Sequence, residues 1–252
     1  MKLLRMHKKK IIFGALIIGC ILVFLFFLLN NDEAEEGVQY LQNQEALKVS
    51  EIEDEMKQLR SEDRKKAVES GQVDVFALFD DYVIFGDSRV YGFGTYGFMP
   101  SGRVFAGGGD TILNVDDWLS TLKSLSPSNV YLSYGVNDMG LNLDETEAGS
   151  YGDLYEQQVN KILEICPDAH IYVNSIIPAT PAAVEESPNW SNVDGYNAQL
   201  KKICEKNGWT YVDNTALVEG KSTDSIYQSD GIHFLNSFYT PWAQNMIDAS
   251  EE

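Results

Sequence analysis

The sequence predicts an α/β protein, in which a three-layer α/β/α domain with about five parallel strands follows one N-terminal transmembrane helix. Short runs rich in β-branched and aromatic residues alternate with longer segments whose apolar residues recur every three to four positions. Such alternation predicts a parallel sheet with helices on both faces. An unbroken apolar run near the N-terminus predicts the membrane helix.

The expected elements of the domain begin near residue 82 and continue to the end of the chain. In sheets of this kind the ligand site lies beyond the carboxyl ends of the strands, so we expect functional residues directly after strands. The expected strands are 82–85, 103–106, 130–134, 170–177 and 209–213, and the expected helices are 116–125, 151–165, 193–206 and about 236–249.

Residues 11–29 form an apolar stretch without charge or proline, long enough to cross most of a bilayer core as a helix. Five basic residues precede it and an acidic segment follows it, so the positive-inside rule predicts a cytoplasmic segment 1–10 and an extracytoplasmic domain at the cell membrane. A cleaved signal peptide is the first alternative, but the apolar run exceeds a usual signal sequence. Lipidation of Cys20 is the second, because Ile17-Ile18-Gly19-Cys20 is similar to a lipobox.

The net charge of −19 is unevenly distributed along the chain. Without the five basic residues of the N-terminal segment, 14 basic residues face 38 acidic ones, a balance of about −24. A surface of this charge repels nucleic acid and anionic lipids or polymers. Neutral or cationic substrates are therefore favoured, and nucleic-acid binding is excluded from the expected functions.

Residues 30–72 are dense in Glu, Gln, Lys and Asp and contain no proline, which predicts a stalk before the domain at 73–252. Within it Ile52, Met56 and Leu59 recur at helical spacing, so a short exposed helix is expected. A coiled-coil dimer through this stalk is the alternative, but the apolar pattern lasts little more than one heptad. The oligomeric state stays open.

Cys166 and Cys204 are the two cysteines in the region expected to be exported. A disulfide between them would persist outside the cytoplasm. Two buried free thiols are the equal alternative.

Gly86-Asp87-Ser88 directly follows the first expected strand, where a tight turn would present the serine at the carboxyl edge of the sheet. A serine in such a turn is also a common helix cap, so the tripeptide alone favours neither role. As a nucleophile, Ser88 would need a base nearby.

Of the three histidines, His233 is the best candidate for that base. His7 precedes the membrane segment, and His170 opens the fourth expected strand, at the opposite edge of the sheet, where a structural role is expected. Asp230 precedes His233 by three residues, and a carboxylate there can orient the imidazole and stabilise its charged form. We therefore expect Ser88, His233 and Asp230 to act together.

Acyl transfer also needs hydrogen-bond donors for the oxyanion of the tetrahedral intermediate, each worth roughly 3 kcal/mol. Glycines 107–109 follow the second expected strand and allow a backbone N–H to approach a substrate closely. Asn137, in Gly135-Val136-Asn137-Asp138, follows the third strand and offers a carboxamide at the same edge.

The Gly-Asp-Ser, Gly, Gly-x-Asn-Asp and Asp-x-x-His segments resemble the four signature blocks of the SGNH hydrolase superfamily, the GDSL-type esterases and lipases. The resemblance covers about residues 82–249 and suggests a membrane-anchored bacterial member with a flavodoxin-like sheet in strand order 2-1-3-4-5. The resemblance implies a catalytic triad and an oxyanion hole, and a reaction that needs neither a metal nor an organic cofactor. The implied triad is Ser88, Asp230 and His233, and the implied oxyanion donors are Ser88, Gly109 and Asn137.

The expected reaction is two-step acyl transfer through an acyl-enzyme, with activity falling as pH drops through about 6 to 7 because the imidazole base becomes protonated. External placement favours short acyl groups, chiefly acetyl, on cell-envelope carbohydrate. The alternatives are a lysophospholipase or lipase, an SGNH O-acyltransferase, and a catalytically silent tethered binding module. Arg89, Tyr91 and Trp190 are candidate substrate contacts, although Arg89 could instead pair with a local acid.

Overall fold

The computed structural model describes residues 19, 21–22, 26, 31–146 and 149–251. The chain divides into two compact units, Met1–Arg60 and Ser61–Glu252. The predicted segment 1–10 and almost all of the predicted membrane segment 11–29 lie outside the described residues. Within the described ranges, no helix combines the length and apolar character needed to cross a membrane.

A single parallel sheet of five strands forms the centre of the second unit, in the order β2-β1-β3-β4-β5. The predicted α/β class, strand number and strand order are confirmed. The fourth strand is shorter than predicted, because at Ile176 the backbone N–H donates to Asn197 Oδ1 (2.7 Å). The strands are β1 (Tyr82–Gly86), β2 (Val104–Ala106), β3 (Asn129–Ser133), β4 (His170–Asn174) and β5 (Thr210–Val212).

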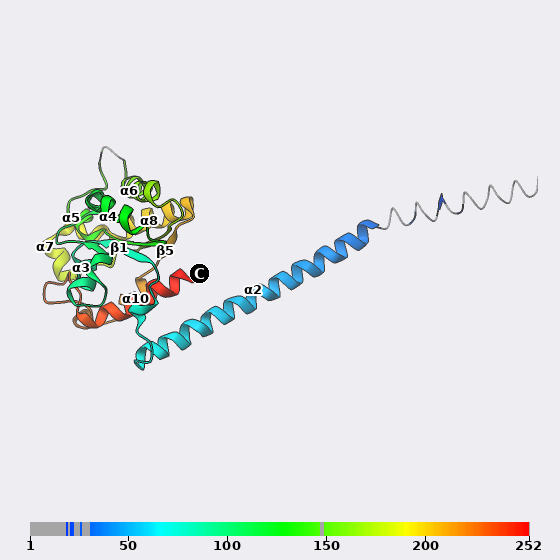
Figure 1. The fold of residues 1–252 in the computed structure, drawn as a ribbon, viewed down its shortest axis with the longest axis horizontal. Helices are drawn as coiled ribbons and strands as arrows, with labels where there is room; N and C mark the ends of the chain where they lie inside the picture. Colours follow the sequence, from blue (N-terminus) through cyan, green and yellow to red (C-terminus); the bar gives the residue numbers. More distant parts are fainter. Residues whose placement is uncertain (1–18, 20, 23–25, 27–30, 147–148, 252) are drawn as a thin grey trace, which may run out of the picture. The chain divides into compact units, whose positions relative to one another are not determined.

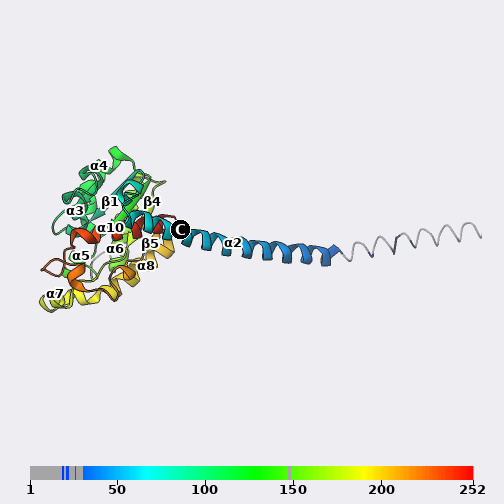
Figure 2. The ribbon, with the colours of Figure 1, turned by 90° about the horizontal axis from the view of Figure 1, so that it is seen from below.

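Helices cover both faces of this sheet (Figures 1 and 2). On one face lie α4 (Val115–Leu125), α6 (Tyr151–Ile165) and α8 (Val193–Asn207), and on the other lie α3 (Ser88–Thr95) and α10 (Asn236–Ser250). Helices α4, α6, α8 and α10 are confirmed close to their predicted bounds. The sequence pattern missed the short elements α5 (Val136–Gly140), α7 (Pro181–Glu186), α9 (Thr215–Val218) and the single 3-10 turns η1 (Val75–Leu78), η2 (Ser101–Arg103), η3 (Ile112–Asn114), η4 (Pro188–Asn192) and η5 (Thr223–Ser225).

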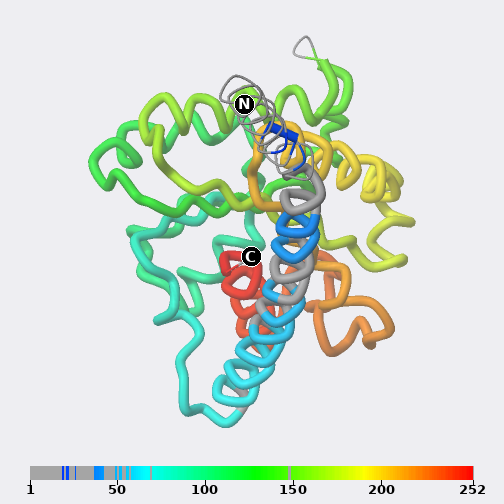
Figure 3. The backbone as a smooth tube through the Cα atoms, turned by 90° about the vertical axis from the view of Figure 1, so that its right-hand side faces the viewer, coloured from blue at the N-terminus to red at the C-terminus, as the bar shows by residue number. Residues whose placement is uncertain are grey.

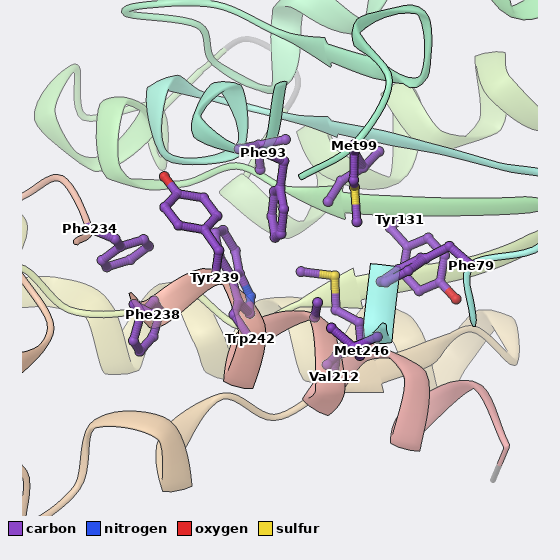
Figure 4. Close-up of a cluster of buried hydrophobic side chains, with 14 of the residues drawn as sticks. Phe79, Phe93, Met99, Tyr131, Val212, Phe234, Phe238, Tyr239, Trp242 and Met246 are labelled. Carbon is purple, nitrogen blue, oxygen red and sulfur yellow. The ribbon is translucent and has the colours of Figure 1, made fainter. Parts of the chain in front are cut away.

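Apolar side chains fill the space on each side of the sheet, because its central strands are buried on both faces. Figure 4 shows the core between the sheet and α10, where aromatic rings pack edge to face. The Phe93 ring lies 4.8 Å from that of Tyr239. Trp242 is fully buried, and its indole Nε1 donates to Asn174 Oδ1 (3.2 Å), which satisfies a polar atom inside this core.

Cys166 and Cys204 are both buried and both free. Burial raises the pKa of the Cys204 thiol to about 12. The two cysteines are therefore thiols packed in the core, the second of the two alternatives left open by the sequence.

The predicted stalk contains one long helix, α2 (Asn31–Glu69), which begins well before the short helix expected around residue 52. The last part of α2 belongs to the second unit, since Arg64 Nη1 donates to Asp248 (3.1 Å) and Nη2 to Glu251, and Val68 packs on the core. After α2 the chain turns back towards β1 (Figure 3). The compact unit accordingly begins at Ser61, earlier than the expected boundary at residue 73.

Candidate active site

Ser88 is the first residue of α3, directly after the carboxyl end of β1. The turn into the helix is tight: a Cβ on Gly86 would lie 2.2 Å from Val90 Cγ2 and 2.6 Å from Ser133 O, so only glycine fits. Asp87 caps the helix by accepting a hydrogen bond from Arg89 N (2.9 Å). This local chemistry leaves the Ser88 side chain partly exposed at the edge of the sheet, between β2 and β3.

The structure brings Ser88, His233 and Asp230 into one hydrogen-bonded chain. The Ser88 Oγ lies 2.8 Å from His233 Nε2, and His233 Nδ1 lies 2.6 Å from Asp230 Oδ2. The other oxygen of Asp230 accepts from the backbone N–H groups of Ile232 and His233, each at 2.9 Å. Burial alone would raise the pKa of Asp230, but the hydrogen bonds from His233 and these N–H groups outweigh it and lower that pKa below its ordinary value.

The loop that carries Asp230 and His233 is held in place by the segment after β4. Gly231 has φ +70°, and a Cβ there would lie 2.1 Å from Thr180 Oγ1, so the turn requires glycine. Thr180 N donates to Gly231 O (2.9 Å). His170, in contrast, is the first residue of β4 and lies at the amino-terminal edge of the sheet, and His7 lies outside the described residues.

Arg89 does not face the substrate side of the site, which corrects its proposed role as a substrate contact. Its side chain is buried, with 4% of the residue exposed, because it donates to two backbone carbonyls from distant segments. Nε donates to Ile232 O (2.9 Å) and Nη1 to Ile177 O, and the guanidinium carbon lies 4.9 Å from the centre of the Phe234 ring. The hydrogen bonds of Arg89 therefore connect α3 to the loop that carries His233.

The two segments expected to supply oxyanion donors lie together. Asn137 is in α5, directly after β3, and its Nδ2 donates to Asp110 O (2.8 Å), which leaves its second amide hydrogen available. A second link joins the same segments, because Ile112 N donates to Asp138 Oδ1 (2.9 Å). Gly109 has φ +84°, a conformation that favours glycine.

Trp190 supports the helix of Asn137. Its indole Nε1 donates to Val136 O (2.8 Å), and a Cβ on Gly140 would lie 3.2 Å from the same nitrogen, so the ring lies directly against α5. Tyr91, the remaining candidate contact, is 49% exposed. Of the three candidate substrate contacts, Tyr91 alone therefore has a largely free side chain.

Two buried carboxyls at the site were not identified from the sequence. Burial raises the pKa of Asp87 to about 6, although the charge of Arg89 acts against it. Burial also raises the pKa of Asp138 to about 7, although the hydrogen bond from Ile112 N acts against it. In the sequence, only their positions next to Ser88 and Asn137 indicated that Asp87 and Asp138 belong to the site. Their burial could not be predicted, because segments far away in the sequence cover them.

In the part of the chain that the structure describes, no group of three or more His, Cys, Asp or Glu side chains could hold a metal ion. The arrangement is a serine hydroxyl, an imidazole and a carboxylate at the carboxyl edge of a parallel sheet, beside an amide and a glycine turn. A hydroxyl, an imidazole and a carboxylate in this order are the groups that nucleophilic acyl transfer uses.

The family follows from a comparison of sequences, in which residues 84–239 match the GDSL-like lipase/acylhydrolase family. The chain belongs to this family and is a hydrolase. No curated protein matches the chain.

Solved structures with the same fold include several acylhydrolases. A GDSL-like lipase from Bacteroides thetaiotaomicron is 18% identical and superimposes with a TM-score of 0.50 over 74% of this chain and 95% of that chain. A lipase/acylhydrolase from Enterococcus faecalis is 16% identical, with a TM-score of 0.50 over 67% and 94%. An acetylxylan esterase from Geobacillus stearothermophilus, a catalytic mutant, is 16% identical, with a TM-score of 0.50 over 67% and 93%.

Proposed function

We propose that this hydrolase is a serine esterase in which Ser88 is the nucleophile, His233 the base and Asp230 the residue that orients the base. One observation carries the proposal: Ser88 Oγ, the imidazole of His233 and the Asp230 carboxylate form a continuous hydrogen-bonded chain, with distances of 2.8 and 2.6 Å. Because Nδ1 faces the carboxylate, it carries the proton, and Nε2 is free to accept the proton of the serine.

The reaction proceeds in two steps. His233 takes the Ser88 proton as Oγ attacks the ester carbonyl, and the resulting imidazolium returns the proton to the alcohol that leaves. Water then attacks the acyl-enzyme while the same imidazole takes its proton, and collapse of the second tetrahedral intermediate releases the acid and restores Ser88. The oxyanion accepts hydrogen bonds from the backbone N–H groups of Ser88 and Gly109 and from the Asn137 amide.

We further propose that the substrates are short acyl esters, chiefly acetyl, on cell-envelope carbohydrate. The side chains of His233 and Asp230 are 40% and 43% exposed, which suits an acyl group carried on a large, hydrated molecule. Tyr91 on α3 and Tyr96, directly after that helix, are exposed, and such rings stack well on sugars. One of the structural neighbours is an acetylxylan esterase, an enzyme for acetyl esters on a polysaccharide. The membrane anchor at 11–29 and the extracytoplasmic location belong to the same proposal and rest on the sequence pattern.

Hydrolysis of p-nitrophenyl esters by the full chain tests this function. We expect acetate to be cleaved faster than octanoate or longer esters, and Ser88→Ala to lower kcat/KM by at least about a thousandfold. The matched control is Ser124→Ala, which changes an exposed serine on α4 and should leave the rate unchanged. Preference for long chains would assign a lipase activity instead. A folded protein that neither hydrolyses esters nor reacts at Ser88 with a fluorophosphonate would overturn the proposal.

A further inference from the structure

A cavity of about 490 Å³ lies in the unit Ser61–Glu252, and none of its lining residues belongs to the triad or to the oxyanion segments. Three elements form its walls: the last turns of α2, the short helix α9, and the middle of α10. The volume falls within the range of about 300–1,000 Å³ typical of pockets for small molecules. The family's activity and the proposed esterase function leave this cavity without a role.

Two lysines are among the residues that line this cavity. Lys65 and Lys221 both line it and both are exposed, and neither makes an ion pair with any described residue. Asp248 also lines the cavity, but its carboxylate is already engaged, because it accepts from Arg64 Nη1 (3.1 Å) and Gln244 Nε2 (2.8 Å). Two ammonium groups without an ion pair among the described side chains, on a chain of net charge −19, are a local exception that favours an anion.

The rest of the lining is largely apolar. Val68 of α2, Leu217 of α9 and Pro241 of α10 face the cavity from its three walls. Val68 and Leu217 are partly or wholly buried, so the apolar floor is part of the folded unit. A ligand that satisfies both features has an apolar chain and an anionic end.

We propose that this cavity binds an anionic amphiphile, a carboxylate or similar anion on a short apolar chain. The chain lies against Val68, Leu217 and Pro241, and the anionic end lies between Lys65 and Lys221. Because the ligand contacts α2 and α10 together, it binds the folded unit and not the unfolded chain. Binding therefore stabilises the packing of the end of α2 on the domain.

Titration of the full chain with hexanoate tests the site, with the protein held in phosphatidylcholine nanodiscs and binding followed by calorimetry. We expect saturable binding of hexanoate and a higher Tm in its presence. Acetate, which lacks the chain, hexanol, which lacks the charge, and hexylamine, which has the opposite charge, should each bind at least about tenfold more weakly.

The decisive variant is Lys65→Gln/Lys221→Gln, and the matched control is Lys201→Gln/Lys202→Gln on α8, which makes the same change in net charge away from the cavity. We expect the first to weaken hexanoate binding at least about tenfold and the second to leave it unchanged. Both should keep wild-type hydrolysis of p-nitrophenyl acetate, which shows that they fold. Weaker hexanoate binding to the wild type in nanodiscs containing phosphatidylglycerol, with the residual binding of the double variant the same in both lipids, would support the site and identify a lipid as the competing anion. Hexanoate binding that is equal in both double variants, or equal binding of hexylamine, would overturn the proposal.

Discussion

Asp138 shows how one side chain connects the two loops of the site. It follows Asn137 in α5 and accepts from Ile112 N in the segment after β2, so it holds the glycine turn beside the amide. Its neighbours include the buried carboxyl of Asp87, which further raises its pKa. In the folded chain Asp138 therefore keeps a proton up to a pH of about 7, while in the unfolded chain it loses that proton near pH 4.

The pH dependence of stability should reveal this carboxyl. Between about pH 4 and 7 unfolding releases the Asp138 proton, so its contribution to the free energy of unfolding falls as pH rises and is constant above pH 7. Asp138→Asn keeps an acceptor for Ile112 N and removes the titration. We expect the free energy of unfolding of the variant, relative to that of the wild type, to be higher at pH 8 than at pH 4 by a few kcal/mol, as measured by urea unfolding. A difference that is the same at both pH values would contradict the burial argument.

Trp190 should affect catalysis through Asn137. Trp190→Phe keeps the apolar ring and removes the hydrogen bond to Val136 O, which loosens α5. Because an oxyanion donor acts in the transition state, we expect kcat to fall about tenfold with little change in KM, less than the hundredfold or more for loss of a donor. Trp209→Phe, in the same core cluster but away from α5, is the control and should keep the wild-type kcat. An increase in KM alone would indicate a substrate contact instead.

At the scale of elements, the position of Ser88 depends on how closely α3 packs on α10. Gly92 is the point of contact: a Cβ there would lie 1.8 Å from the Tyr239 hydroxyl, which donates to Arg89 O (2.9 Å). Figure 4 shows Tyr239 in this core, with Phe93 and Trp242 beside it. The glycine in this helix is therefore required by packing, although glycine weakens a helix by itself.

Gly92→Ala should therefore destabilise the domain, against the usual preference of helices for alanine. We expect a loss of about 1–3 kcal/mol, because the side chain must displace Tyr239 from a filled core. Gly102→Ala is the control, since its added Cβ meets nothing within 4 Å, and it should leave the stability nearly unchanged. Urea unfolding measures both, and an equal or higher stability of Gly92→Ala would show that α3 and α10 can separate at little cost.

At the scale of the whole molecule, the folded unit includes the end of α2. Arg64 is only 16% exposed and reaches Asp248 and Glu251 at the opposite end of the unit's sequence, and Val68 packs on the core. The end of α2, from Ser61 onward, is therefore part of the packed unit Ser61–Glu252.

Two fragments test this boundary. A fragment that begins at Ser61 keeps the ion pairs of Arg64 and the buried surface of Val68, whereas a fragment that begins at Gln72 loses both. We expect the shorter fragment to be less stable by about 2 kcal/mol, mostly from the lost apolar contact. Equal midpoints in urea would show that the domain needs nothing before residue 72.

Local patterns sufficed for the main elements and for the candidate triad. Strand runs and helical periodicity depend on residues near one another, and the motifs of Ser88, Asn137 and His233 each follow a recognisable turn. The short helices α5, α7 and α9 were missed because so few turns carry no clear period.

The sequence alone determined the α/β class, the strand order through the family resemblance, and which residues are candidates for the chemistry. Tertiary structure decided what those side chains touch. Ser88 and His233 meet across a separation of 145 residues, Arg89 is buried, and Trp190 lies against α5. The cavity with its two lysines also exists only after folding. The physical reason is that periodicity and turns are local properties of a chain, whereas burial and contact depend on segments that only folding brings together.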